Sequence, residues 1–144
     1  MASEIEHLDC CNRTQKVITH LLADAETNSP WIATAAFYKA LHIVEAIFFN
    51  DRSISHTCDH DDREAKLKSQ RKYEYIYRNY SPLKRASLNA RYLSNCATFD
   101  EYLPPQKVID LLLKHHLHQI EQSGKKLIQN PNKIIPIQSA FSGS

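Results

Sequence analysis

The chain contains very little glycine, with only Gly124 and Gly143 among its 144 residues. Tight turns between β-strands often use glycine, because it reaches positive φ angles without steric cost. A β-rich fold of this length would need many such turns, so the scarcity of glycine favours helices joined by short loops. The length suits one domain and is sufficient to bury a hydrophobic core without disulfides or a structural metal.

Long apolar runs and a spaced set of cysteines are also missing. No uninterrupted stretch approaches the roughly 18 apolar residues typical of a membrane span. The acidic start MASEIEHLDCC lacks the basic and apolar segments of a signal peptide. Cys10 and Cys11 are adjacent, whereas Cys58 and Cys96 stand alone, a pattern that favours reduced thiols. We therefore expect a cytoplasmic protein with no membrane partner.

Capping residues and apolar periodicity predict the first two helices. Ser3 and Glu6 have the spacing of a capping box, and the apolar positions that follow predict a helix over 4–26. Ser29-Pro30 combines an N-cap residue with a proline suited to the first helical position, and predicts the start of a second helix. The segment that follows is apolar around most of its circumference, which is typical of a central helix.

Three more helices are expected after a polar loop over 50–60. A basic helix should run from Asp61 to about Asn79, and Ser81-Pro82 should begin the next one. The last should run over 106–123, with Gly124 as its C-cap. Five helices with short connections predict an all-α fold, an antiparallel bundle of about five helices.

The predicted bundle occupies residues 1–124 as a single domain. Residues 125–144 form an irregular C-terminal tail, because they contain two prolines and show no helical period. Ile134, Ile135 and Ile137 give the tail apolar side chains that we expect to dock on the bundle.

Positive charge is concentrated in the middle of the chain. The net charge is only +2, but residues 63–91 contain nine Lys or Arg residues and two acids. Five tyrosines accompany these cations: Tyr73, Tyr75, Tyr77, Tyr80 and Tyr92. Cations beside aromatic rings suit RNA, since they can pair with phosphates and stack on unpaired bases. A solvated helix face with tyrosines partly in the core is the alternative explanation. The predicted RNA-binding residues are Arg63, Lys66, Arg71, Arg78, Arg85 and Arg91.

A loop rich in histidine and aspartate precedes the basic helix, and two explanations of it remain open. His56, Cys58 and His60 could ligate zinc, but a structural zinc site normally needs a second ligand pair. The only candidate second cluster is His115, His116 and His118, of which His115 and His118 would share a helix face. Alternatively, the aspartates stabilise the positive end of a helix dipole. We expect no bound metal and no cofactor.

The order of three segments resembles the HEPN family, the higher eukaryotes and prokaryotes nucleotide-binding domains. These segments are AAFYKALHIVEAIFF, SISHTCDHDDR and YSPLKRASLNARYL, and the resemblance covers about residues 30–95. The positions that carry it are Phe37, Tyr38, Ala40, Ser55, His56, Arg63, Tyr80, Leu83, Ser87, Ala90, Arg91 and Tyr92. It implies a bundle of four or five helices that often dimerises.

The resemblance further implies an RNA-directed protein of a prokaryotic toxin or defence system, which binds RNA and cleaves it without metal. The catalytic residues would be His56, Arg63 and Arg91, since histidine can transfer a proton and arginine can stabilise phosphate charge. The usual family signature, an arginine followed after four to six residues by a histidine, is not found at the expected position. Arg13 and His20 have that spacing but lie in the first predicted helix, and we treat their match as chance.

The alternative function is that of a non-catalytic helical interaction subunit, which dimerises or binds a cognate protein. The second predicted helix is apolar on nearly all sides, and a bundle of five helices would leave part of it uncovered, including Trp31, Phe48 and Phe49. Because an exposed apolar patch often marks an interface, we expect a homodimer.

Overall fold

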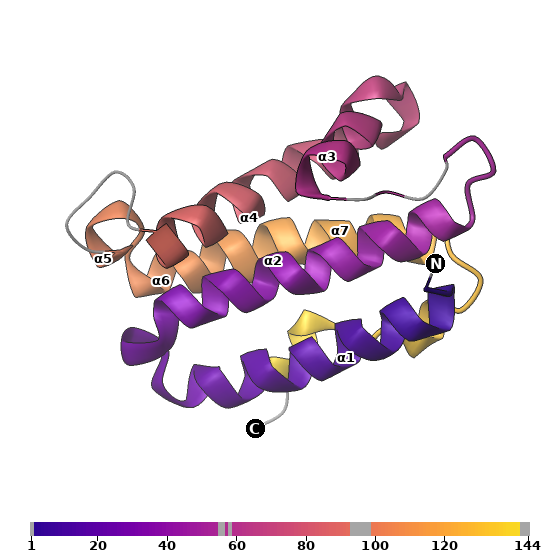
Figure 1. Cartoon of the computed structure of the whole chain (residues 1–144). Helices are drawn as coiled ribbons and strands as arrows, with labels where there is room; N and C mark the ends of the chain where they lie inside the picture. Colours follow the sequence, from indigo (N-terminus) through magenta and orange to yellow (C-terminus); the bar gives the residue numbers. More distant parts are fainter. Residues whose placement is uncertain (1, 55–56, 58, 93–98, 142–144) are drawn as a thin grey trace.

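The computed structural model describes residues 2–54, 57, 59–92 and 99–141. The fold is all-α, as predicted: it is 84 % helical, about six helices pack against each other, and no strand occurs among the residues described. Figure 1 shows the long helices lying side by side, with α2 between α1 and α4.

The first two helices form a long hairpin. Helix α1 (Glu4–Leu21) begins with the predicted capping box, in which Ser3 and Glu6 each bond to the other's backbone. A short 3₁₀ turn, η1 (Leu22–Asp24), follows, and α2 (Ala25–Phe49) begins immediately after it. The Asp24 carboxylate caps α2 by accepting a hydrogen bond from the Thr27 amide.

The predicted start of α2 at Ser29-Pro30 is therefore wrong. Pro30 lies inside the helix, where it removes one backbone hydrogen bond. Ser29 is buried, and its hydroxyl donates to the Asp100 carboxylate at 3.2 Å instead of capping the helix. Asp24 provides the N-cap about one turn earlier, so α2 is already helical at Ser29.

Helix α2 is the central element of the core. Its largest fully buried side chains include Phe37, Ile32 and Ile43. Within the helical run Glu4–Phe49, an 18-residue window is long and apolar enough, by length and composition alone, to cross a membrane. In the structure, 67 % of this window is buried, as expected of a core helix that neighbouring helices cover.

The basic segment divides differently from the prediction. Helix α3 (His60–Ser69) is capped by Asp59, ends at Gln70 and is followed by η2 (Arg71–Tyr73). Helix α4 (Glu74–Tyr92) then runs without a break through Pro82, so the predicted helix start at Ser81-Pro82 is wrong. Tyr80 and Leu83, on either side of Pro82, are both fully buried. A continuous helix keeps both in the core, which offsets the hydrogen bond that Pro82 cannot make.

The last helical segment is assembled from four consecutive pieces. These are α5 (Phe99–Tyr102), α6 (Pro105–Lys107), the π-helix η3 (Val108–Leu117) and α7 (His118–Lys125). The prediction of Gly124 as a C-cap is wrong, because Gly124 is a buried residue within α7. A Cβ atom at Gly124 would lie only 2.6 Å from Cγ2 of Ile43, so glycine permits the close approach of α7 to α2.

The C-terminal tail packs against the bundle and contains two 3₁₀ turns, η4 (Pro131–Lys133) and η5 (Ile137–Ala140). Ile134 and Ile137 are 3 % and 1 % exposed, so the expected docking is confirmed for these two residues. The Glu4 carboxylate accepts hydrogen bonds from the amides of Gln129 and Asn130 at 2.8 and 2.9 Å, which ties the tail to the start of α1. In Figure 1 the tail is yellow and returns along α1.

Candidate functional site

Arg63 is the most deeply buried member of the predicted RNA-binding set. The cap at Asp59 starts α3 one turn earlier and directs Arg63 toward α2, where its Nε pairs with Oε1 of Glu45 at 2.5 Å. The Thr57 hydroxyl donates to the same oxygen, also at 2.5 Å. Only 7 % of Arg63 is exposed. The structure thus places Arg63 in an interior ion pair that fastens α3 to α2, and not on the basic surface.

His60 lies directly beside this ion pair. Its ring packs on Phe37 with the centroids 5.5 Å apart, and its Nδ1 lies 3.0 Å from Nη1 of Arg63. A guanidinium can only donate, so Nδ1 is the acceptor and the ring proton is on Nε2. Burial, together with the nearby charges of Arg63, Lys84 and Arg91, lowers the pKa of His60. His60 is therefore held neutral and oriented as a hydrogen-bond donor.

Arg91 lies at the C-terminal end of α4 and contacts aromatic rings. Its Nη1 donates to the Tyr38 hydroxyl at 3.3 Å, and its guanidinium lies 5.8 Å from the Tyr38 ring centre and 5.4 Å from that of Tyr92. Within the ranges that the structure describes, no carboxylate forms an ion pair with Arg91. The positive charge of Arg91 is one of the causes that lower the pKa of His60.

Two adjoining hollows line the surface between α3 and α4, with volumes of about 380 and 270 Å³, and Tyr77 lines both. Five cations border them: Lys68, Arg71, Arg78, Lys84 and Arg85. We call these two hollows and their five cations the basic groove. Three of the predicted RNA-binding residues line it: Arg71, Arg78 and Arg85. Arg63 and Arg91 do not line it.

Ion pairs reduce the charge of the groove only in part. Lys84 pairs with Glu64, and Lys68 approaches the same carboxylate at 3.7 Å. Arg78 pairs with Glu74 at 3.0 Å, one turn away on α4. For Arg71 and Arg85 the structure shows no carboxylate partner among the residues it describes, and both side chains are exposed. Lys66, the remaining predicted contact, is half-buried on α3 and does not line either hollow.

The five tyrosines of the basic segment are distributed between core and surface. Tyr73 and Tyr80 are buried, which matches the alternative explanation of tyrosines in the core. Tyr77 is half-buried, and its hydroxyl donates to Glu64 at 3.0 Å. Tyr75 and Tyr92 are exposed, but the Tyr75 hydroxyl donates to Gln119, on the side of α7. Only Tyr77 lines the basic groove.

The remaining predicted residues fall into two groups. Ser55, His56 and Cys58 lie outside the residues that the structure describes, so it does not place the catalytic candidate His56. His115 and His116 lie next to each other, with ring centroids 4.8 Å apart. Throughout the described ranges, no group of three or more His, Cys, Asp or Glu side chains is arranged to hold a metal ion.

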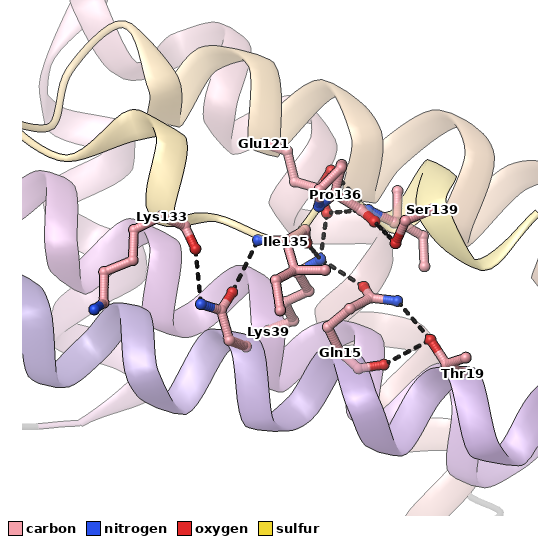
Figure 2. Close-up of polar contacts among 10 residues, drawn as sticks. Gln15, Thr19, Lys39, Glu121, Lys133, Ile135, Pro136 and Ser139 are labelled. Carbon is pink, nitrogen blue, oxygen red and sulfur yellow. Dashed lines mark hydrogen bonds and ion pairs between the residues drawn. The ribbon is translucent and has the colours of Figure 1, made fainter. Parts of the chain in front are cut away.

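A fully buried polar network is the main feature that sequence reasoning missed. Lys39 of α2 and Glu121 of α7 form an ion pair with no exposure of either side chain. Figure 2 shows Lys39 donating also to the side chain of Gln15, at 2.6 Å, and to the Ile135 carbonyl, at 2.8 Å. Its three ammonium hydrogens thus have three acceptors. The available signal was Lys39 itself, which is the only lysine or arginine in this mostly apolar helix.

This network is structural, because the charged groups of Lys39 and Glu121 at its centre are not exposed to solvent. The Glu121 carboxylate also accepts a hydrogen bond from the Ile137 amide, at 3.0 Å from Oε2. Asn12 adds a second attachment, since it donates to the Lys133 carbonyl and accepts from the Ile135 amide. Burying a charge is costly unless the charge is paired and hydrogen-bonded, as it is here. The network therefore anchors the C-terminal tail in the core.

Comparison of the chain with models of known protein families, with curated proteins and with solved structures finds no match.

Proposed function

We propose that the protein binds single-stranded RNA in the basic groove between α3 and α4. The observation that carries the proposal is the pair of adjoining hollows around Tyr77, bordered by five cations and two acids. Arg71 and Arg85 are the strongest candidate contacts, because both are exposed and no ion pair in the described structure occupies them. A row of cations of this kind suits the regularly spaced phosphates of a nucleic-acid strand.

The groove favours contact with the phosphate backbone over recognition of bases. Tyr77 is the only tyrosine that lines it, and its hydroxyl is already engaged by Glu64. Phosphate contacts position a strand but carry no sequence information. We therefore propose weak sequence preference and a strong dependence of affinity on salt.

The HEPN-like assignment and its antiparallel bundle belong to the same proposal. The proposal is supported by contacts between residues from the separate segments that resemble the HEPN family. Phe37 packs on Tyr80 with centroids 5.4 Å apart, and Tyr38 contacts Arg91. A cytoplasmic role in a prokaryotic toxin or defence system remains part of the proposal, on the resemblance alone.

We extend the proposal to metal-independent cleavage of RNA, with His56 as the residue that would transfer a proton. His60 is a poorer candidate for a general base, because Arg63 occupies the lone pair of its Nδ1 and its Nε2 carries a proton. The distinguishing experiment incubates single-stranded RNA with the purified protein, with and without EDTA. Cleavage that persists in EDTA and is lost in His56→Gln, but not in His60→Gln, would support this mechanism.

The binding proposal is tested by fluorescence anisotropy with a labelled, unstructured RNA of about 12 nucleotides, within the usual size range for single-strand sites. The test protein is the double variant Arg71→Gln/Arg85→Gln. Lys107→Gln/Lys126→Gln is the matched control, since it removes the same charge from exposed positions outside the groove. We expect the first variant to bind much more weakly than the control. Equal affinities of the two variants would refute the groove as the RNA site.

A protein-partner function has its own supporting observation. Trp31 and Tyr92 are 64 % and 67 % exposed, and tryptophan, tyrosine and arginine are the residue types most enriched at the centres of protein interfaces. Of the other residues that suggested a homodimer, Phe49 is 41 % exposed, whereas Phe48 is buried. Sedimentation of the free protein at several concentrations tests this proposal, and a strict monomer at about 50 μM, a working range for weak interfaces, would count against it.

A further inference from the structure

A hollow between α1 and α2 is separate from the basic groove and takes no part in the proposed RNA binding. Its volume is about 360 Å³, which is within the range of small-molecule sites. The residues that matter for its chemistry are Arg13, Thr14 and Val17 from α1 and Ala35, Tyr38 and His42 from α2. None of the described residues that line it is acidic.

Arg13 supplies an available positive charge at this hollow. Its side chain is exposed, and within the described ranges no hydrogen bond or ion pair engages its guanidinium. Asp9 lies one helical turn earlier, at the spacing that favours an ion pair, but its carboxylate pairs with Lys133 at 3.5 Å. The guanidinium is thus left without a competing anion and is free to bind one from solution.

Other residues that line the hollow offer apolar and neutral polar surface. Val17 is 48 % exposed, and the Tyr38 ring is held in place by the hydrogen bond from Arg91. His42 is oriented by His7, since their Nδ1 atoms lie 3.1 Å apart, and its Nε2 remains as a hydrogen-bonding atom. Burial and the nearby charges of His7 and Arg63 lower the pKa of His42 to about 4, so its ring is neutral at neutral pH.

We propose that this hollow binds a small organic anion, an apolar ring that carries one phosphate or carboxylate group. The anionic group would pair with Arg13, and guanidinium suits both phosphate and carboxylate because it offers parallel donors. The ring would lie against Tyr38 and Val17, where the surface is apolar. This site stands independently of the RNA proposal, because no described residue lines both the hollow and the basic groove.

The test uses the full-length protein labelled with ¹⁵N and a titration with phenyl phosphate followed by NMR. We expect saturable shifts of the Thr14 and Ala35 amides, with a Kd of about 1 mM for a ligand of this size. Arg13→Gln should weaken binding about tenfold, because it removes a charge-assisted contact. Lys16→Gln is the matched control, since it removes an exposed charge from the same helix outside the hollow.

Three outcomes would overturn the proposal. The first is equal affinity in Arg13→Gln and Lys16→Gln, which would mean that Arg13 does not bind the anion. The second is an affinity for inorganic phosphate equal to that for phenyl phosphate, which would indicate an adventitious ion only. The third is loss of binding in Arg71→Gln/Arg85→Gln, which would move the anion to the basic groove. The same titration with benzoate in place of phenyl phosphate then shows whether the hollow binds a carboxylate or a phosphate more tightly.

Discussion

Lys39 and Glu121 form an ion pair at 2.5 Å in which neither side chain is exposed to solvent. The two residues are far apart in the sequence and bring α2 and α7 together at the place where the C-terminal tail crosses them. Both charges also bond to the tail, Lys39 through the Ile135 carbonyl and Glu121 through the Ile137 amide. The pair therefore links two core helices and the last segment of the chain.

We predict that Lys39→Met destabilises the protein by about 3–5 kcal/mol, because it leaves the Glu121 carboxylate buried without its cation. The double variant Lys39→Met/Glu121→Gln should lose less than the sum of the two single variants, since no uncompensated charge remains. Urea denaturation of all four proteins measures the coupling. Additive losses would show that the two charges act independently.

Gly124→Ala should destabilise the protein, although alanine is the better helix former by about 1 kcal/mol. The reason is the 2.6 Å separation that a Cβ atom would have from Cγ2 of Ile43, since overpacking of a core typically costs about 1–3 kcal/mol. In the Ile43→Ala background, which removes the clashing atom, the same substitution should cost less. Thermal unfolding of the four proteins tests this, and a higher melting temperature for Gly124→Ala alone would contradict it.

Stability should fall as the pH is lowered from about 6.5 toward 4. Burial, His7 and Arg63 lower the pKa of His42 from an ordinary 6.5 to about 4, so in this window the unfolded chain binds a proton that the folded protein does not. The loss for one such proton is up to about 1.4 kcal/mol per pH unit. His42→Gln should reduce the slope between pH 6.5 and 4 in urea denaturation.

His60 and His116 contribute to the same window, because burial lowers their pKa values as well. The slope in His42→Gln should therefore be reduced but not abolished. His20→Gln is a suitable control, since this side chain is exposed on α1. An unchanged slope in His42→Gln would contradict the assignment of the titration to His42.

Arg63→Met should lower the stability of the protein and leave its RNA affinity nearly unchanged. Arg63 shares the Glu45 carboxylate with Thr57, and its removal leaves a largely buried acid without a cation, at a cost of about 2–3 kcal/mol. We expect a lower urea midpoint and, at temperatures where the variant is folded, RNA affinity close to that of the unchanged protein. A stable variant with selectively lost RNA binding would instead place Arg63 in the RNA site.

RNA affinity should depend steeply on salt, with a slope of log K against log salt of about −0.7 per phosphate contacted. Arg71→Gln/Arg85→Gln should make the slope less negative by about 1.4, which corresponds to two lost contacts. Anisotropy titrations at several salt concentrations measure this change. An unaltered slope in this variant, or affinity independent of salt in the original protein, would argue against the basic groove.

Local chemistry was sufficient for part of the fold. The capping box of Ser3 and Glu6 forms as predicted, because all its bonds lie within one helical turn. The all-helical class also follows from composition, since a chain with two glycines has few residues for β-turns. Both predictions depend on interactions between near neighbours in the sequence.

Tertiary packing decided what local signals could not. Ser29 and Ser81 each precede a proline and resemble helix starts. Helix α2 nevertheless begins earlier, at the Asp24 cap, and α4 continues through Pro82 with Tyr80 and Leu83 buried in the core. Arg63 belongs to a run of cations in the sequence, but its contact with Glu45 comes from a different helix. A charge pattern records the number of cations, whereas their availability depends on which acids the fold brings to them. For the same reason the basic groove, the hollow at Arg13 and the Lys39–Glu121 pair became visible only once the helices were packed.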